Sequence, residues 1–127
     1  MKLSVITQLR VHDEAVIKQA FELLQKQTIG ANEFEVLIFY NYENVTLEMV
    51  EFIENLKGSY KLNIVLKEGN LDVERLRGEY ITFFDFYTKF RPNVYERLYN
   101  AAQKKDLDFI SACLEEKNEK KIINKKI

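Results

Sequence analysis

The residue with the clearest potential for chemistry is Asp85, which follows the aromatic and β-branched run at residues 80–84. Such a run predicts a strand that is buried on both faces of a sheet. A carboxylate directly after it would lie at the carboxyl end of the strand, where open α/β sheets bind their ligands. Carboxylate oxygens there can hold a divalent cation. An aspartate at a strand end can equally cap the turn that follows, so a structural role stays open.

The strands and helices that would position this residue alternate along the sequence. Apolar runs predict four buried strands and a shorter fifth, at residues 3–7, 34–40, 62–66, 80–84 and 107–112. Apolar residues at helical spacing predict helices that begin after Asp13, after Thr46 and at Pro92. We therefore expect an α/β fold, a three-layer sandwich with a mostly parallel sheet of four to five strands.

The composition indicates one globular domain without a general affinity for nucleic acid. The chain has 127 residues and a net charge of −1, so nothing draws it as a whole to nucleic acid or anionic lipid. We expect a domain at residues 1–113 and a charged tail at residues 114–127, either a frayed helix or disordered. No apolar run reaches the length of a transmembrane segment.

The number of cysteines gives an indication of the cellular compartment. Cys113 is the single cysteine and cannot form an internal disulfide, which favours a reducing, cytoplasmic location. Peripheral association with a membrane stays open, because the tail ends in the lysine-rich segment KKIINKK.

Several common nucleotide and catalytic motifs are absent. The sequence contains no GxGxxG, no GxxxxGK[ST] and no GxSxG, which argues against a Rossmann dinucleotide site, a P-loop and a nucleophile elbow. His12 is the single histidine and precedes a predicted helix, where a surface or capping role is favoured over catalysis.

Taken in order, several segments resemble the N-terminal half of a family 2 glycosyltransferase, an enzyme family with the GT-A nucleotide-sugar fold. KLSVIT resembles the first strand of that family, and FELLQKQT resembles the helix that follows. FEVLIFYNYEN resembles its second strand, and GEYITFFD resembles the strand that leads into its DxD motif. The resemblance extends over residues 2–112 and implies glycosyl transfer from a nucleotide sugar.

The resemblance implies a divalent metal that neutralises the leaving diphosphate. Asp85 matches the first acid of the DxD motif, Phe86 the middle position and Tyr87 the second acid. The motif is therefore degenerate, because a neutral phenol replaces one carboxylate. A Mn²⁺ or Mg²⁺ ion at Asp85 is the cofactor that the resemblance implies.

The resemblance also implies a set of nucleotide-binding residues: Thr7, Tyr40, Asn41, Asn70, Arg75 and Tyr87. Tyr40 and Tyr87 would stack on a base, or alternatively cover the end of the sheet. Arg75, together with Arg77, would contact the diphosphate, or alternatively form a solvated pair beside acidic neighbours. No catalytic residue is assigned, because the second half of the family, with its general base, has no room in this chain.

Two functions remain as hypotheses. The first is a short nucleotide-sugar domain of glycosyltransferase type, active only if Asp85 holds a metal. The alternative is a non-catalytic interaction or regulatory module that uses an exposed aromatic rim, Phe86, Tyr87 and Phe90, to bind a protein partner or itself.

Overall fold

The computed structural model describes residues 1–89, 91–105, 109–114 and 119–125. It contains strands β1 to β6 and helices α1 to α3, in the order β1 (Leu3–Gln8), α1 (Glu14–Gln25), β2 (Phe34–Tyr40), α2 (Leu47–Leu56), β3 (Asn63–Glu68), β4 (Tyr80–Phe83), α3 (Val94–Lys105), β5 (Phe109–Leu114) and β6 (Glu119–Lys125). Three 3₁₀ turns, η1 (Ala31–Glu33), η2 (Lys57–Ser59) and η3 (Val73–Arg75), complete the connections.

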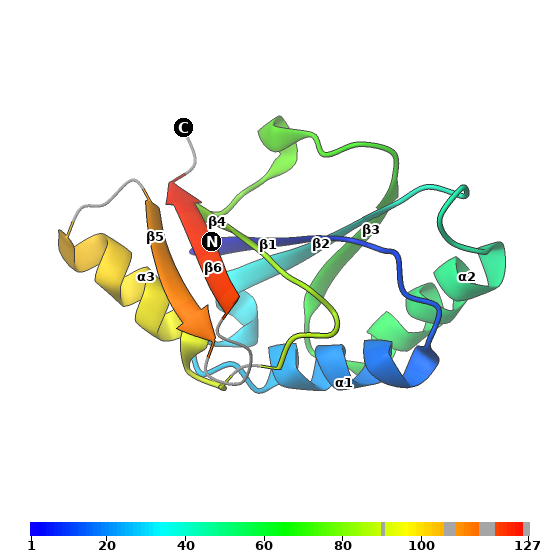
Figure 1. Cartoon of the computed structure of the whole chain (residues 1–127), viewed down its shortest axis with the longest axis horizontal. Coiled ribbons are helices and arrows are strands. Elements are labelled where there is room, and N and C mark those ends of the chain that lie inside the picture. Colours follow the sequence, from blue (N-terminus) through cyan, green and yellow to red (C-terminus); the bar gives the residue numbers. More distant parts are fainter. Residues whose placement is uncertain (90, 106–108, 115–118, 126–127) are drawn as a thin grey trace.

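The strands form one sheet in the order β3-β2-β1-β4-β6-β5. Strands β3, β2, β1 and β4 are parallel, while β6 pairs antiparallel with both β4 and β5 (Figure 1). This arrangement confirms the predicted α/β fold with a mostly parallel sheet.

Strand β6 corrects the expectation for the tail, since Glu119–Lys125 is neither helical nor disordered. Its backbone pairs with β4, which would otherwise leave a row of peptide groups unpaired at the edge of the sheet. The division of the chain into a domain at residues 1–113 and a tail at residues 114–127 stays a prediction.

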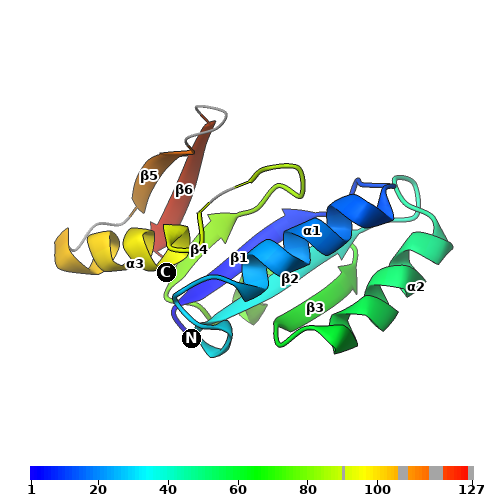
Figure 2. The same ribbon diagram turned by 90° about the horizontal axis from the view of Figure 1, so that it is seen from below.

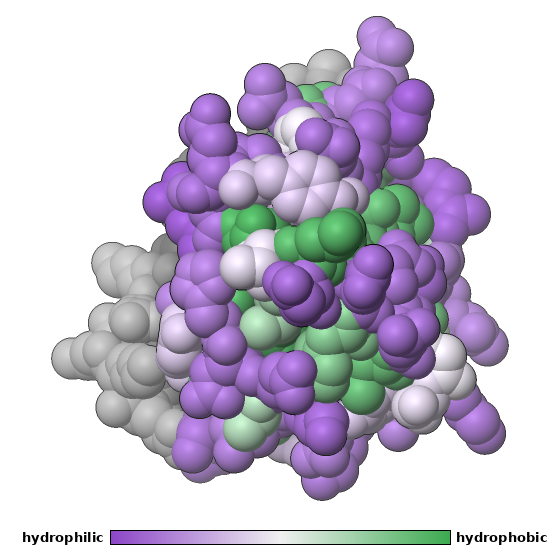
Figure 3. All heavy atoms as spheres, turned by 90° about the vertical axis from the view of Figure 1, so that its right-hand side faces the viewer, coloured by the Kyte–Doolittle hydropathy of each residue, from purple (hydrophilic) through white to green (hydrophobic). Residues whose placement is uncertain are grey.

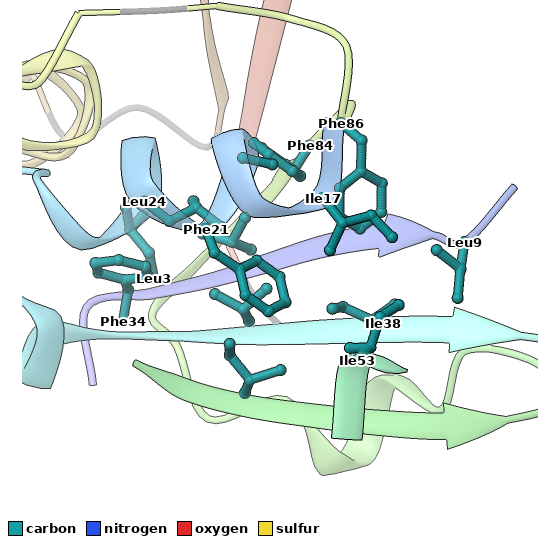
Figure 4. Close-up of a cluster of buried hydrophobic side chains, with 14 of the residues drawn as sticks. Leu3, Leu9, Ile17, Phe21, Leu24, Phe34, Ile38, Ile53, Phe84 and Phe86 are labelled. Atoms are coloured by element: carbon teal, nitrogen blue, oxygen red, sulfur yellow. The ribbon is translucent and has the colours of Figure 1, made fainter. Parts of the chain in front are cut away.

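The main core lies between one face of the sheet and the three helices. Figures 1 and 2 show α1, α2 and α3 on the same side of the strands. Figure 4 shows Phe21 and Leu24 of α1 above Leu3 of β1 and Phe34 of β2, and all four side chains are fully buried. The opposite face carries a smaller cluster that Leu76, from the connection between β3 and β4, packs against. This connection forms the third, thinner layer.

Side-chain caps begin α1 and α2 where the sequence predicts them. The Asp13 carboxylate accepts a hydrogen bond from the backbone N–H of Ala15 at 2.9 Å. The Thr46 hydroxyl accepts one from the backbone N–H of Met49 at 3.2 Å. Both contacts satisfy N–H groups that have no partner within the helix.

A buried carboxylate fixes the start of β4 against β1 and β2. Glu35 of β2 accepts hydrogen bonds from the Ser4 hydroxyl at 2.5 Å and from the Arg77 backbone N–H at 2.6 Å. The Gly78 backbone N–H donates to the Ser4 hydroxyl oxygen at 2.9 Å. Glu35 is 2% exposed, so these contacts replace the water that a carboxylate requires. They set the position of β4 and thereby of Asp85 at its other end.

Alkaline pH is expected to destabilise the fold through Tyr95 of α3. Burial raises the pKa of this phenol far above its usual value near 10, so the folded state strongly favours the neutral form. The unfolding free energy is therefore unaffected by this phenol below pH 10. Above pH 10 the phenol ionises in the unfolded chain only, and the unfolding free energy falls by about 1.4 kcal/mol per pH unit.

Urea denaturation at pH 9 and pH 11 of the wild type and of Tyr95→Phe checks this prediction. The wild type should lose more unfolding free energy between these pH values than the variant, which has no phenol at this position. Equal losses in the two proteins would contradict the assignment.

Candidate functional site

Asp85 lies at the carboxyl end of β4, as the sequence predicts. The Phe84 backbone N–H donates to the Ile6 carbonyl at 2.8 Å and extends the pairing of β4 with β1 by one residue. One carboxylate oxygen of Asp85 then accepts a hydrogen bond from the Tyr87 backbone N–H at 2.9 Å. The Asp85 carbonyl accepts a second from the Thr88 N–H at 3.1 Å. Asp85 therefore caps the turn after the strand, while its side chain remains exposed.

A groove of about 400 Å³ is lined by residues from the carboxyl ends of the paired strands β1 and β4. Its lining combines hydroxyl, amide, guanidinium, carboxylate and phenol groups with apolar walls, and comprises Thr7, Gln8, Arg10, Val11, Phe84, Asp85, Phe86 and Tyr87. Figure 3 shows the side of the molecule toward which β1, β2 and β3 point, with hydrophobic residues gathered at its centre among hydrophilic ones. The mixture of groups that line the groove suits a ligand with an aromatic ring, hydroxyls and an anionic group.

Arg10 is the functional candidate that the sequence interpretation missed. Leu9 and Val11 are 0% and 3% exposed, and the Leu9 N–H donates to the Phe39 carbonyl at 2.7 Å. Because both neighbours are anchored in the core, Arg10 between them is exposed and lines the groove. The alternation of apolar, basic and apolar residues directly after the first strand was the signal that could have identified it.

The three aromatic residues proposed as an exposed rim do not share one environment. Phe86 is 5% exposed and packs edge-on against Phe84, with ring centroids 5.4 Å apart, so its expected exposure was wrong. Figure 4 shows both rings beside Ile17 of α1, which explains the burial: the chain turns back onto this helix. Tyr87 is 54% exposed. Phe90 lies outside the described residues.

Tyr40 and Asn41 follow one another at the carboxyl end of β2, outside the lining of the Asp85 groove. The Tyr40 ring packs edge-on against Tyr42, with centroids 5.4 Å apart. Burial, followed by the hydrogen bond with Tyr42, raises the pKa of Tyr40 to about 12, so its phenol stays protonated at neutral pH. The Asn41 side-chain oxygen accepts a hydrogen bond from the Glu43 N–H at 3.0 Å and thus holds the turn after the strand.

Arg75 lies apart from Asp85. It pairs with Asp72 at 3.3 Å and lines a second groove, of about 230 Å³, together with Val65 and Arg77. Arg77 pairs with the buried Glu35 at 3.3 Å. Asn70 is exposed and follows Gly69, whose φ of +104° and N–H donation to the Tyr40 carbonyl place this turn beside the end of β2.

The groove offers a poor set of donors for the divalent metal that the resemblance implies. Asp85 is the one carboxylate among the described residues that line it, and one of its oxygens already accepts the Tyr87 N–H. Tyr87 is a neutral phenol, whereas Mg²⁺ and Mn²⁺ prefer carboxylate, carbonyl and water oxygens. Nowhere in the described part of the chain do three or more histidine, cysteine, aspartate or glutamate side chains converge on a point that could hold a metal.

Comparison with known proteins supports the fold. No family model and no curated protein matches this sequence. Among solved structures, residues 1–349 of TarS from S. aureus superpose with a TM-score of 0.69 at 20% identity, covering 86% of this chain and 34% of that one. TarS is also known in complex with UDP-GlcNAc and with UDP.

A second similar structure is that of a mannosyltransferase. The mannosyltransferase PcManGT from Pyrobaculum calidifontis, in complex with GDP-Man and Mn²⁺, superposes with a TM-score of 0.68 at 14% identity, covering 89% of this chain and 35% of that one. The chain thus spans about a third of the length of these structures. At such identities the likeness establishes a shared fold, and the predicted α/β architecture is confirmed at that level.

No helix in the described ranges is both long enough and apolar enough to cross a lipid bilayer.

Proposed function

We propose that this chain is a nucleotide-sugar-binding domain of GT-A type that holds its ligand in the groove between the carboxyl ends of β1 and β4. The observation that carries the proposal is the position of Asp85, Arg10 and Tyr87 around one groove at this edge of the sheet. Ligands of open α/β sheets bind at this edge. Two proteins that share the fold are known in complexes with UDP-GlcNAc and GDP-Man.

Each group around the groove is assigned to a different part of the ligand. Tyr87 is half exposed and offers a ring on which the base stacks. The Asp85 oxygen that does not cap the turn accepts hydrogen bonds from ribose hydroxyls. Tyr40, Asn41 and Asn70 lie at the ends of β2 and β3 and extend the polar edge of the site. Arg75 lines a different groove, so we assign it no part in binding.

Sugar transfer would need more than this site. A general base must accept the proton of the acceptor hydroxyl as the sugar–phosphate bond breaks. We assign such a base to no described residue, because no carboxylate or histidine other than Asp85 lines the groove within the described part of the chain. The proposed activity of the chain itself is therefore donor binding, with transfer completed by an acceptor site that these residues do not supply.

Thermal denaturation with UDP, UDP-GlcNAc and GDP-Man, in the presence of Mn²⁺ or of EDTA, tests this function. A saturating ligand that binds the folded state should raise the Tm by several degrees. Tyr87→Ala should reduce the rise, whereas Leu47→Ala should preserve it. Leu47 is the control, since it is 54% exposed, as Tyr87 is, and lies outside the groove. Absence of any nucleotide effect on the Tm would refute the proposal.

One observation favours the alternative function, an interaction module. Tyr87 and Phe83 are 54% and 51% exposed, which is unusual for aromatic residues at the end of a buried strand. Self-association through Tyr87 would appear as a dimer in sedimentation velocity whose dissociation constant rises in Tyr87→Ala. A monomer at all concentrations would argue against it.

A further inference from the structure

We propose that Arg10, and not a divalent cation, neutralises the diphosphate of the ligand in the groove between β1 and β4. Nucleotide binding would then be independent of metal. The inference rests on the proposed function, which it deepens by assigning the charge that the diphosphate meets.

The position of Arg10 is set by the core on both sides. Leu9 continues the pairing of β1 with β2 through its hydrogen bond to Phe39, and Val11 is buried two residues later. The backbone at Arg10 is therefore held by neighbours that cannot leave the core without a large loss of apolar burial. A guanidinium on a fixed backbone presents its N–H groups to two phosphate oxygens at once, which a flexible loop does less well.

Arg10 also differs from the other arginines near the sheet in its partners. Arg75 and Arg77 are paired with Asp72 and Glu35, at 3.3 Å in each case. Arg10 takes part in none of the ion pairs formed among the described residues. No carboxylate in the described part of the chain is therefore paired with its charge, which an anionic ligand can compensate.

Asp85 carries a negative charge, so its role in the groove differs from that of Arg10. With one oxygen engaged by the Tyr87 N–H, it has one oxygen left for a ligand. Without a metal, this carboxylate would repel a diphosphate at close range. The diphosphate is therefore expected to lie toward Arg10, on the β1 side of the groove, with Asp85 directed to neutral hydroxyls of the ligand.

Isothermal titration calorimetry with UDP on the full chain, in EDTA and in Mn²⁺, tests the inference. In the wild type, the Kd in EDTA should lie within about twofold of the Kd in Mn²⁺. Arg10→Gln should raise the Kd roughly tenfold or more, because a hydrogen-bonded charge pair is lost, and Arg10→Lys should give an intermediate value. Arg75→Gln is the matched control, an exposed arginine of the other groove, and should leave the Kd within about twofold.

Asp85→Asn distinguishes neutralisation of the diphosphate by Arg10 from neutralisation by a metal ion bound at Asp85. The asparagine side-chain oxygen can still accept the Tyr87 N–H, so the turn should be preserved. Because the ribose-facing oxygen becomes an NH₂ donor, the substitution should raise the Kd for UDP by the same factor in EDTA and in Mn²⁺. Binding that requires Mn²⁺ and disappears in Asp85→Asn would overturn the role of Arg10 while leaving the proposed function intact. Failure of the wild type to bind UDP, UDP-GlcNAc or GDP-Man under either condition would overturn both.

Discussion

Gly78→Ala is expected to destabilise the protein by roughly 3 kcal/mol or more. A Cβ atom at this position would lie 2.4 Å from the Leu3 carbonyl carbon and 2.4 Å from the Ser4 nitrogen. Both are backbone atoms of β1, so no side-chain rotation can relieve the overlap. The added methyl group would push β4 away from the strand that it pairs with.

Gly58→Ala provides the matched control for this substitution. No described atom lies within 4 Å of a Cβ built at Gly58, which belongs to η2 after α2. The change should be neutral or should stabilise by up to about 1 kcal/mol, through a lower entropy of the unfolded chain. Urea denaturation of the two variants measures the difference, and equal stabilities would show that β4 is not packed as closely on β1 as described.

Glu35→Ala should also have a large effect, a loss of about 3 kcal/mol in unfolding free energy. The substitution removes the acceptor for the Ser4 hydroxyl and the Arg77 N–H, and these donors would lose their partner in the interior. Arg77 itself can return to water, since its side chain is 59% exposed. The cost therefore arises mainly from the buried donors and from the cavity left by the side chain.

Glu33→Ala is the control, the same change two residues earlier in the chain. Glu33 is 44% exposed and contacts Lys2 at 3.9 Å, a surface ion pair that contributes little. Its replacement should change the unfolding free energy by no more than about 0.5 kcal/mol. A similar loss in both variants, measured by denaturant unfolding, would argue against a specific role of the buried carboxylate.

The parts of the fold that local sequence patterns specify were predicted closely. The second strand, predicted at residues 34–40, is observed as β2 (Phe34–Tyr40). A continuous apolar and β-branched run is most stable as a buried strand of a parallel sheet, so its position could be read from the sequence. The caps at Asp13 and Thr46 were also predicted, since an N-cap depends on residues within one helical turn.

Features that depend on distant partners could not be predicted from local patterns. Strand β6 forms because β4 offers it an edge, whereas its own lysine-rich sequence gives no clear strand signal. Phe86 is buried because the chain turns back toward α1, and nothing in residues 85–90 specifies that direction. For the same reason, the sequence could not separate Arg75, held by Asp72, from the groove at Asp85.

The sequence predicted the place of Asp85 at the end of its strand, but it did not predict all of the residues that line the groove beside it. Asp85 lies where the strand pattern placed it, and Thr7 and Tyr87 line the same groove. Arg10 was missed because an arginine outside any motif resembles many surface residues until its neighbours are known to be buried. The function of these residues stays a proposal, since fold alone does not determine activity.

A ¹H–¹⁵N NMR titration of the full chain with UDP in EDTA tests the central claim most directly. We expect the largest chemical shift changes at the backbone amides of Thr7, Arg10, Asp85 and Tyr87, with Val65 and Arg75 of the second groove unaffected. Absence of changes at saturating UDP, or changes confined to the second groove, would contradict the claim that the groove between β1 and β4 binds a nucleotide.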